Sequence, residues 1–380
     1  MSTSTDVIII GGGVLGVSLA YHLSKRKINC VVLEMEQILG SQASGKNAGM
    51  IRQLYRHPKL TSWAMHSIES WQKNNKDDFC NDMCSKTVFK QTGSYIVGRT
   101  SPNHHNHLFT DTTLFGAPTV LTQTDGLLDS GLYLNTLEKH CDRKYVKFYL
   151  RTKVIHVENN NTWNITTNNP SEKNLSSKWL VNASGAWAGN TLSPFLNISK
   201  SSIEPFARHL AVVSGWEDTK LLDQQNKENI TNSADNGFIW DEISEWYMRP
   251  WDLSAKLVSV CDQTPACPET FTPNPFILTE IANKLITAFP TQSTKLSITK
   301  SWHCFRTYTL DKLPVWGESQ SIPYLFWLAG FGGFGMSTSF AATKDAALYI
   351  AGKTMANDTL VDDFKQKLSD FSPDRILPSL

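Results

Sequence analysis

The sequence lacks the features that mark several large classes of protein. Its charges almost cancel, with 36 lysines and arginines against 35 aspartates and glutamates, so no strong positive field favours nucleic acid as a partner. The apolar run at residues 7–19 is interrupted by glycines and is too short to span a bilayer, which takes about 20 residues. No basic segment precedes this run, so no secretory signal is indicated. We expect a cytoplasmic protein, and peripheral association with a membrane stays open.

The seven cysteines are few for a disulfide-rich protein, and their number is odd. They show neither a pairing pattern nor the spacing of a zinc site, so we expect no metal and interpret them as thiols in a reducing compartment. The composition itself is that of an ordinary globular protein, with 41% hydrophobic and 19% charged residues. A length of 380 residues suits about two domains.

The two ends of the chain predict units of strand, glycine loop and helix. Residues 6–10 are a β-branched run that ends in glycine, which is typical of a buried parallel strand. Apolar residues recur at helical spacing over residues 14–25, and residues 29–33 form a second apolar run closed by Glu34. Residues 325–329 lead through a glycine-rich loop into a helix expected at 338–350. These units indicate an α/β fold rather than a bundle or a sandwich.

Between the two ends the pattern predicts mainly strands. Strands are expected at residues 93–97, 146–150, 154–157, 163–167, 179–182, 210–213, 246–248 and 257–260, and helices at 60–76 and 132–140. We predict a Rossmann-like cofactor domain of mixed sheet, assembled from residues 1–85, 145–203 and 300–380. An inserted substrate domain with an antiparallel sheet would comprise residues 86–144 and 204–299.

The first loop carries a dinucleotide-binding motif. Gly11 permits a tight turn, Gly13 lets the backbone approach a diphosphate, and Gly16 lets the helix pack closely on the strand. The free N–H groups at the start of the following helix favour the same anion. Glu34 lies eighteen residues beyond Gly16, at the end of the second strand, where its carboxylate can accept hydrogen bonds from ribose hydroxyls. The motif alone fits both FAD and NAD.

Two further segments favour a flavin. Residues 41–52 are small, polar and glycine-containing, which suits a backbone that wraps around a bulky ring. The loop at residues 330–335 precedes a helix whose positive end could neutralise charge on a reduced flavin. A nicotinamide enzyme needs no second loop of this kind. An NAD-dependent dehydrogenase, or a binding protein that uses the dinucleotide structurally, stays open as an alternative.

Four segments together resemble the flavoprotein family of D-amino-acid oxidase, glycine oxidase and monomeric sarcosine oxidase. They are the glycine loop with Glu34, residues 44–49 (SGKNAG), residues 181–187 (VNASGAW), and residues 306–317 followed by 329–335 (AGFGGFG). The resemblance extends from residue 7 to about residue 350. It implies FAD-dependent oxidation of a small amino acid or amine, in which flavin N5 takes a hydride and the imine product hydrolyses. Oxygen or a quinone-linked carrier would accept the electrons.

Oxidation of a hydroxy acid or a polyol phosphate is the alternative within the same fold. A hydroxyl substrate generally needs a base to take its proton. Only His57 and His209 are candidates for that base in this sequence.

The same resemblance implies the cofactor and substrate sites. Besides Gly11, Gly13, Gly16 and Glu34, the residues implied for FAD are Val14, Leu15, Met35, Ser44, Lys46, Asn47, Ala48, Gly49, Met50, Val154, Ala183, Ser184, Gly185, Trp187, Cys304, Gly332, Gly333, Phe334, Gly335, Met336 and Ser337. Arg306 is expected to bind a substrate carboxylate through a bidentate ion pair, unless it bridges to Asp311 or to a carbonyl group. Arg52 and Tyr247 are the other catalytic candidates.

Three positions bear on which branch of the family the chain resembles. Cys304 stands where sarcosine-oxidising relatives carry a cysteine bonded to the flavin, so a thioether link is one hypothesis and a small residue beneath the ring is the other. Phe334 and Ser337 replace a histidine and a lysine of that branch. The loss of a cation beside the flavin argues against sarcosine as the substrate and against a fast oxidase.

Overall fold

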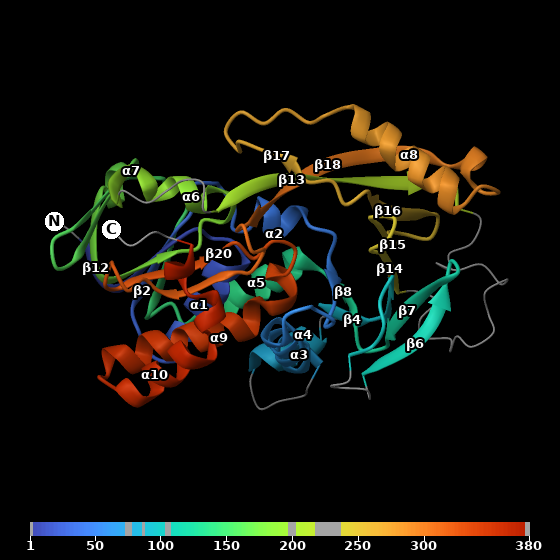
Figure 1. Ribbon diagram of the computed structural model, residues 1–380. Coiled ribbons are helices and arrows are strands. Elements are labelled where there is room, and N and C mark those ends of the chain that lie inside the picture. Colours follow the sequence, from blue (N-terminus) through green and yellow to red (C-terminus); the bar gives the residue numbers. More distant parts are fainter. Residues whose placement is uncertain are drawn as a thin grey trace.

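The computed structural model describes residues 3–72, 78–85, 88–102, 108–196, 203–216 and 237–376. In these residues the strands form sheets of eight, nine and three strands. The eight-stranded and nine-stranded sheets lie at opposite ends of the molecule (Figure 1).

The eight-stranded sheet is built around β1. Its strands are β1 (Thr3–Ile10), β2 (Cys30–Leu33), β9 (Val146–Tyr149), β10 (Val154–Asn159), β11 (Trp163–Thr167), β12 (Asn174–Asn182), β19 (Val315–Glu318) and β20 (Leu325–Ala329). β1 pairs in parallel with β2 on one side and with β12 on the other, so that Ile9 lies opposite both Val32 and Val181. β20 extends the parallel set beside β12. Because these strands are parallel, their carboxyl ends meet at one edge of the sheet.

Helices cover one face of this sheet. They are α1 (Val14–Ser24), α3 (Pro58–Gln72), α4 (Asp78–Ser85), α5 (Ser130–His140), α9 (Gly335–Thr354) and α10 (Asp358–Lys367). α9 packs against α1, α3 and α10, and the hydroxyl groups of Ser18 and Thr343 join α1 to α9 at 2.7 Å. The short helices α6 (Ala188–Thr191) and α7 (Ser193–Leu196) pack on the opposite face. The sheet is therefore buried on both sides, as its continuous apolar strands require.

The nine-stranded sheet is antiparallel except where β5 and β14 pair in parallel. Its strands are β5 (Ser94–Val97), β6 (Phe109–Leu114), β7 (Ala117–Thr122), β13 (Glu204–Ser214), β14 (Phe238–Asp241), β15 (Trp246–Pro250), β16 (Ala255–Ser259), β17 (Thr264–Pro265) and β18 (Ser297–Tyr308). α8 (Phe276–Ala288) packs on it through Ile277, Ile281 and Leu285. β3 (Met50–Ile51), β4 (Phe89–Gln91) and β8 (Gly126–Leu128) form the small sheet.

β13 and β18 connect the two ends of the molecule. They pair along their whole lengths, from Glu204 opposite Tyr308 to Ser214 opposite Ser297, and run side by side in Figure 1. β18 also contacts α2 (Ala43–Lys46) and the short helix η2 (Gly185–Trp187). This placement brings residues 304–308 beside the carboxyl edge of the eight-stranded sheet.

The structure confirms the predicted fold class, a mixed sheet with helices and a second, largely antiparallel sheet. The predicted helix at residues 60–76 is α3, which ends at Gln72, and residues 73–76 lie outside the described residues. The division into two domains stays a prediction. Within residues 86–144, assigned to the substrate domain, β5–β7 join the nine-stranded sheet, whereas α5 packs on α1. Within the described ranges, no helix has the length and apolar composition needed to cross a bilayer.

Candidate functional site

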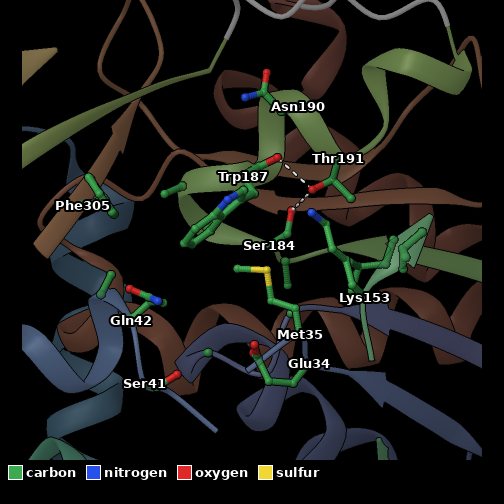
Figure 2. Close-up of a pocket in the computed structure, with 18 of the residues that line it drawn as sticks. Glu34, Met35, Ser41, Gln42, Lys153, Ser184, Trp187, Asn190, Thr191 and Phe305 are labelled. Atoms are coloured by element: carbon green, nitrogen blue, oxygen red, sulfur yellow. Dashed lines mark hydrogen bonds between the residues drawn. The ribbon is translucent and has the colours of Figure 1, made fainter. Parts of the chain in front are cut away.

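A first cavity lies where the parallel strands of the eight-stranded sheet end. Gly11 follows β1, Glu34 follows β2 and Ala183 follows β12, and all three line a cavity of about 290 Å³. Figure 2 shows Glu34 and Met35 on one side of this cavity and Ser184 and Trp187 on another. The carboxyl edge of a parallel sheet is the place where such folds bind ligands.

The glycines of the first loop are required by close contacts. Gly11 has a φ of +107°, and a Cβ atom there would lie 2.4 Å from the carbonyl oxygen of Ala183. A Cβ atom at Gly16 would lie 2.0 Å from the carbonyl oxygen of Gly11. Gly16 lines neither this cavity nor the two described below. The absence of a side chain at Gly16 lets α1 pack closely against the loop, which is the role predicted from the sequence.

The amino end of α1 faces the cavity without an acidic partner. Gly13 is the N-cap and supplies no side chain, the first turn contains no acidic residue, and the backbone N–H of Val14 donates to Ser44 Oγ at 2.9 Å. Helix amino ends carry partial positive charge and unpaired N–H groups, which suit a diphosphate. The geometry therefore fits the anionic part of a dinucleotide.

Glu34 is held in position by the loop that it faces. Its Oε2 accepts the backbone N–H of Gly12 at 2.7 Å, and its Oε1 accepts that of Glu36 at 2.9 Å. Burial raises the pKa of the Glu34 carboxyl, although these two hydrogen bonds oppose the rise. Met35 and Val154 line the same cavity.

Hydrogen bonds fix the wall that follows β12. Ser184 Oγ donates to Asn182 Oδ1 at 2.6 Å and lies 3.1 Å from Thr191 Oγ1, which donates to the carbonyl oxygen of Trp187 at 2.9 Å (Figure 2). Ser184 and Trp187 were predicted. Thr191 and Phe305 also line the first cavity, and neither was predicted from the sequence.

A second cavity, of about 150 Å³, continues from the first. It is lined by segments from the amino-terminal and carboxyl-terminal parts of the chain. Gly13, Ser44, Ala183 and Gly185 line both cavities. The predicted residues around the second cavity also include Val14, Leu15, Asn47, Ala48, Gly49, Met50, Cys304, Gly332, Gly333, Gly335 and Met336. The structure thus brings the amino-terminal glycine loop, the turn after α2 and the carboxyl-terminal glycine loop together.

The carboxyl-terminal loop is shaped by close contacts of its own. Gly332 has a φ of +48°, its N–H donates to the carbonyl oxygen of Thr307 at 2.9 Å, and a Cβ atom there would lie 2.5 Å from the Tyr308 ring. α9 begins directly after Phe334, with neither a side-chain cap nor an acidic residue in its first turn. A second helix amino end without an acidic partner therefore lies beside the second cavity.

Four residues predicted for the cofactor line neither of these cavities: Gly16, Lys46, Phe334 and Ser337. The Lys46 ammonium group donates to Gln42 Oε1 at 3.0 Å. Ser337 Oγ accepts the backbone N–H of Arg52 at 3.3 Å. Phe334 lines a third cavity instead.

The third cavity, of about 570 Å³, joins the second. Trp240, Arg306 and Gly333 line both, so Arg306 stands at the junction. A Cβ atom at Gly333 would lie 2.9 Å from Arg306 Nη1. Arg306 has no ion pair within the described residues. Asp311, which was a possible partner, is bound by Arg375 Nε at 2.7 Å. The predicted alternative, a bridge from Arg306 to Asp311, is therefore not present.

Arg52 also lines the third cavity, but it is partly engaged. Its guanidinium group lies 4.2 Å from the centre of the Trp240 ring and 3.4 Å from Glu242 Oε1. Glu242 is bound more closely by Arg99, at 2.7 and 2.9 Å. Burial opposes ionisation of Glu242, but the Arg99 hydrogen bonds outweigh it and lower the pKa of this carboxyl. Neither Trp240 nor Glu242 was predicted.

Tyr247 and Cys304 are both buried. Tyr247 packs 5.0 Å from the Trp240 ring and lines none of the three cavities, and its hydroxyl has no hydrogen-bond partner in the described part of the chain. Cys304 lines the second cavity, and burial raises the pKa of its thiol.

Three connected cavities run from the strand ends past two helix amino ends to an arginine, an arrangement that fits a dinucleotide-binding protein with a further pocket beside the dinucleotide site. Residues 6–347 match the model of the DAO family, described as FAD-dependent oxidoreductases. The chain belongs to this family, so the cofactor is FAD, as the two glycine loops predicted.

Solved structures of the same fold come from several organisms. L-proline dehydrogenase from P. horikoshii covers 92% of this chain and 94% of its own, with a TM-score of 0.75 and 20% identity. Glycine oxidase from Geobacillus kaustophilus covers 98% of both chains, with a TM-score of 0.72 and 18% identity. The glycerol 3-phosphate oxidase of Mycoplasma genitalium is 48% identical over 46 residues, and this stretch is only 12% of either chain. The likeness to the two solved structures shows the fold.

Proposed function

We propose that this enzyme oxidises the carbon–nitrogen bond of an amino acid, or of a secondary amine that carries a carboxylate. Bound FAD would supply the two-electron acceptor for this oxidation, and the imine product would hydrolyse in water. The observation that carries the proposal is the position of Arg306. Its guanidinium group has no carboxylate partner among the described residues and borders both the second and the third cavity.

The cofactor is proposed to extend from the first cavity into the second. The adenosine diphosphate part would lie with Glu34 and Val154 in the first cavity, and the flavin ring would lie among the two glycine loops in the second. The contacts that leave no room for a Cβ atom at Gly11 or Gly332, and the two helix ends without acidic residues, support this placement.

Arg306 would orient the substrate. A guanidinium group can bind a carboxylate through two parallel hydrogen bonds, which fixes the position of the neighbouring carbon beside the second cavity. The glycine at position 333 leaves the space next to Arg306 Nη1 open. Cationic neighbours such as Arg52 lower the pKa of a substrate amine, and this favours the neutral form that can give up a hydride.

A hydroxy acid or polyol phosphate is the second candidate, and the short match to a glycerol 3-phosphate oxidase is the observation in its favour. Its oxidation would need a base at the third cavity. His57 lines that cavity, but its Nε2 lies 3.2 Å from Asp370 Oδ2 and its Nδ1 accepts the backbone N–H of Lys59. His209 does not line the cavity, and its Nδ1 binds Asp262 at 2.8 Å. These contacts favour the amine.

The experiment is anaerobic bleaching of the flavin absorbance in the purified holoprotein. The panel comprises D- and L-amino acids, glycine, N-methyl amino acids, hydroxy acids and glycerol 3-phosphate. Amino compounds should bleach the flavin and release ammonia or the matching amine. Bleaching by hydroxyl compounds alone would refute the proposal in favour of the second candidate.

Substitution of Arg306 tests its part in the reaction. Arg306→Met should raise KM for the bleaching substrate roughly 10- to 150-fold, the equivalent of one charge-assisted hydrogen-bonded contact. Arg306→Lys keeps the charge without the planar fork and should recover part of the loss. Equal KM values in Arg306→Met and the unaltered protein would show that the carboxylate binds elsewhere.

A further inference from the structure

A buried arginine that was not predicted from the sequence also lines the third cavity. Arg208 on β13 is only 2% exposed, and its Nη1 is buried without a hydrogen-bond partner among the residues that the structure describes. A buried N–H left unpaired is costly, and more so on a charged group. Such groups are rare in folded proteins and call for a specific explanation, of which a bound ligand is one.

The neighbouring carboxylate does not provide the missing partner. Asp262 approaches Arg208 only at 3.8 Å, from Oδ1 to Nε, while Nε itself donates to the Asp262 carbonyl oxygen at 2.6 Å. Both carboxylate oxygens of Asp262 accept shorter hydrogen bonds from His209, at 2.9 Å from its backbone N–H and 2.8 Å from Nδ1. Asp262 thus positions Arg208 through its backbone and leaves Nη1 available.

Arg208 and Arg306 face the same cavity from the same side of a β-ribbon. Arg208 lies directly opposite Cys304 in the antiparallel pair of β13 and β18, and Arg306 is two residues beyond Cys304. Residues two apart on a strand point to the same face, so the two arginines are diagonal neighbours, with Cα atoms roughly 7–8 Å apart. Two cations fixed this close to each other are suited to a ligand with two negative groups.

The charge around the third cavity supports the same conclusion. Six arginine and lysine side chains line it against three carboxylates. Two of these carboxylates, Glu242 and Asp311, are already bound by Arg99 and Arg375. The excess positive charge exceeds what a single substrate carboxylate would neutralise.

We propose that the substrate is an amino dicarboxylate, with one carboxylate bound by Arg306 and the second by Arg208. This inference rests on the proposed function and adds the substrate class to it. Arg208 would determine specificity, because an uncharged substrate end would leave its Nη1 unpaired and so bind less tightly.

Ligand binding to the holoprotein tests the proposal without any turnover. Glutarate and its monoamide have nearly the same shape and differ by one carboxylate, and each can be titrated against the flavin absorbance spectrum. Glutarate should bind roughly 10- to 150-fold more tightly, as expected for one charge-assisted contact. In Arg208→Gln this ratio should fall to about 1, with the Kd of the monoamide little changed.

Two further variants separate a specific contact from general attraction and from misfolding. Lys312→Gln removes one positive charge from an exposed position at the same cavity and should keep most of the preference for glutarate. Arg208→Lys keeps the charge and should retain part of that preference, with the flavin content and melting temperature of each variant as folding controls. An equal loss in Lys312→Gln and Arg208→Gln, or no preference in the unaltered protein, would overturn the proposal.

The same preference should appear in turnover. Glutamate or aspartate should bleach the flavin faster than glutamine or asparagine of the same configuration, and Arg208→Gln should abolish the difference. Bleaching by neutral amino acids with no advantage for the acids would overturn this inference and leave the proposed function intact. Tight glutarate binding with no bleaching by any amino compound would instead refute the proposed function.

Discussion

Replacement of Asp125 by asparagine tests the electrostatics of a buried carboxyl group that is influenced by the charge of Arg52. Asp125 is fully buried, and its carboxylate accepts hydrogen bonds from the backbone and side chain of Gln53, both at 3.0 Å, and from Ser94 Oγ at 2.5 Å. Burial raises the pKa of Asp125 from 3.8 to about 7, although these hydrogen bonds oppose the rise.

Because the pKa of Asp125 is raised in the folded state, the free energy of unfolding depends on pH. The folded state keeps the Asp125 proton up to about pH 7, whereas the unfolded state loses it near the ordinary aspartate pKa. The free energy of unfolding therefore falls as the pH rises toward 7 and is constant above it. Between pH 5 and pH 8 the loss is ~3 kcal/mol, at 1.36 kcal/mol for each pH unit between 5 and 7.

Denaturant unfolding of the holoprotein at pH 5 and pH 8 measures this difference. Asp125→Asn stays neutral throughout, so it should gain ~3 kcal/mol relative to the unaltered protein between the two pH values. Asp363→Asn, which removes an exposed carboxylate from α10, serves as the control. The same pH dependence in the Asp125→Asn and unaltered proteins, or an unaltered protein that is more stable at pH 8 than at pH 5 relative to Asp125→Asn, would refute the reasoning.

Three further predictions concern the cofactor site and its supports. Gly16→Ala should abolish FAD retention, measured as the ratio of flavin to protein absorbance, because its Cβ would lie 2.0 Å from the Gly11 carbonyl oxygen. Acid precipitation should leave a colourless pellet and a yellow supernatant. Burial raises the pKa of the Cys304 thiol and so disfavours the thiolate that would bond to the flavin. A yellow pellet that turns colourless in Cys304→Ser would establish the covalent link. Asp129→Ala should lower the unfolding free energy by about 1 kcal/mol, because Asp129 caps α5 through the N–H of Leu132 at 2.9 Å, whereas Asp129→Asn should have a smaller effect.

The sequence predicted the cofactor half of the molecule because local patterns determine it. β1, α1, β2 and β20 are continuous apolar segments joined by glycines, and the close contacts of Gly11 and Gly16 explain why those glycines occur there. Residues far apart in the chain could be assigned to one site because the resemblance to the flavoprotein family implied them together.

The substrate side was harder to predict because register and pairing determine it. The pattern at residues 297–308 gave no strand, since β18 is exposed over its first half and buried only toward Tyr308. Without β18, nothing placed Arg208 opposite Cys304. Arg208 is the one charged residue in the mainly apolar segment 207–213, and this pattern could have indicated a functional side chain. The adjacent His209 was named from the sequence instead.

The order of β1, β12 and β20 in the central sheet has a consequence for how the enzyme is made. These neighbouring strands come from residues 3–10, 174–182 and 325–329, so the sheet cannot close until most of the chain has left the ribosome. Contacts between such distant segments form slowly. The nascent protein must therefore wait for β20 and α9 before it can capture the flavin, and fragments that stop before α9 should emerge colourless.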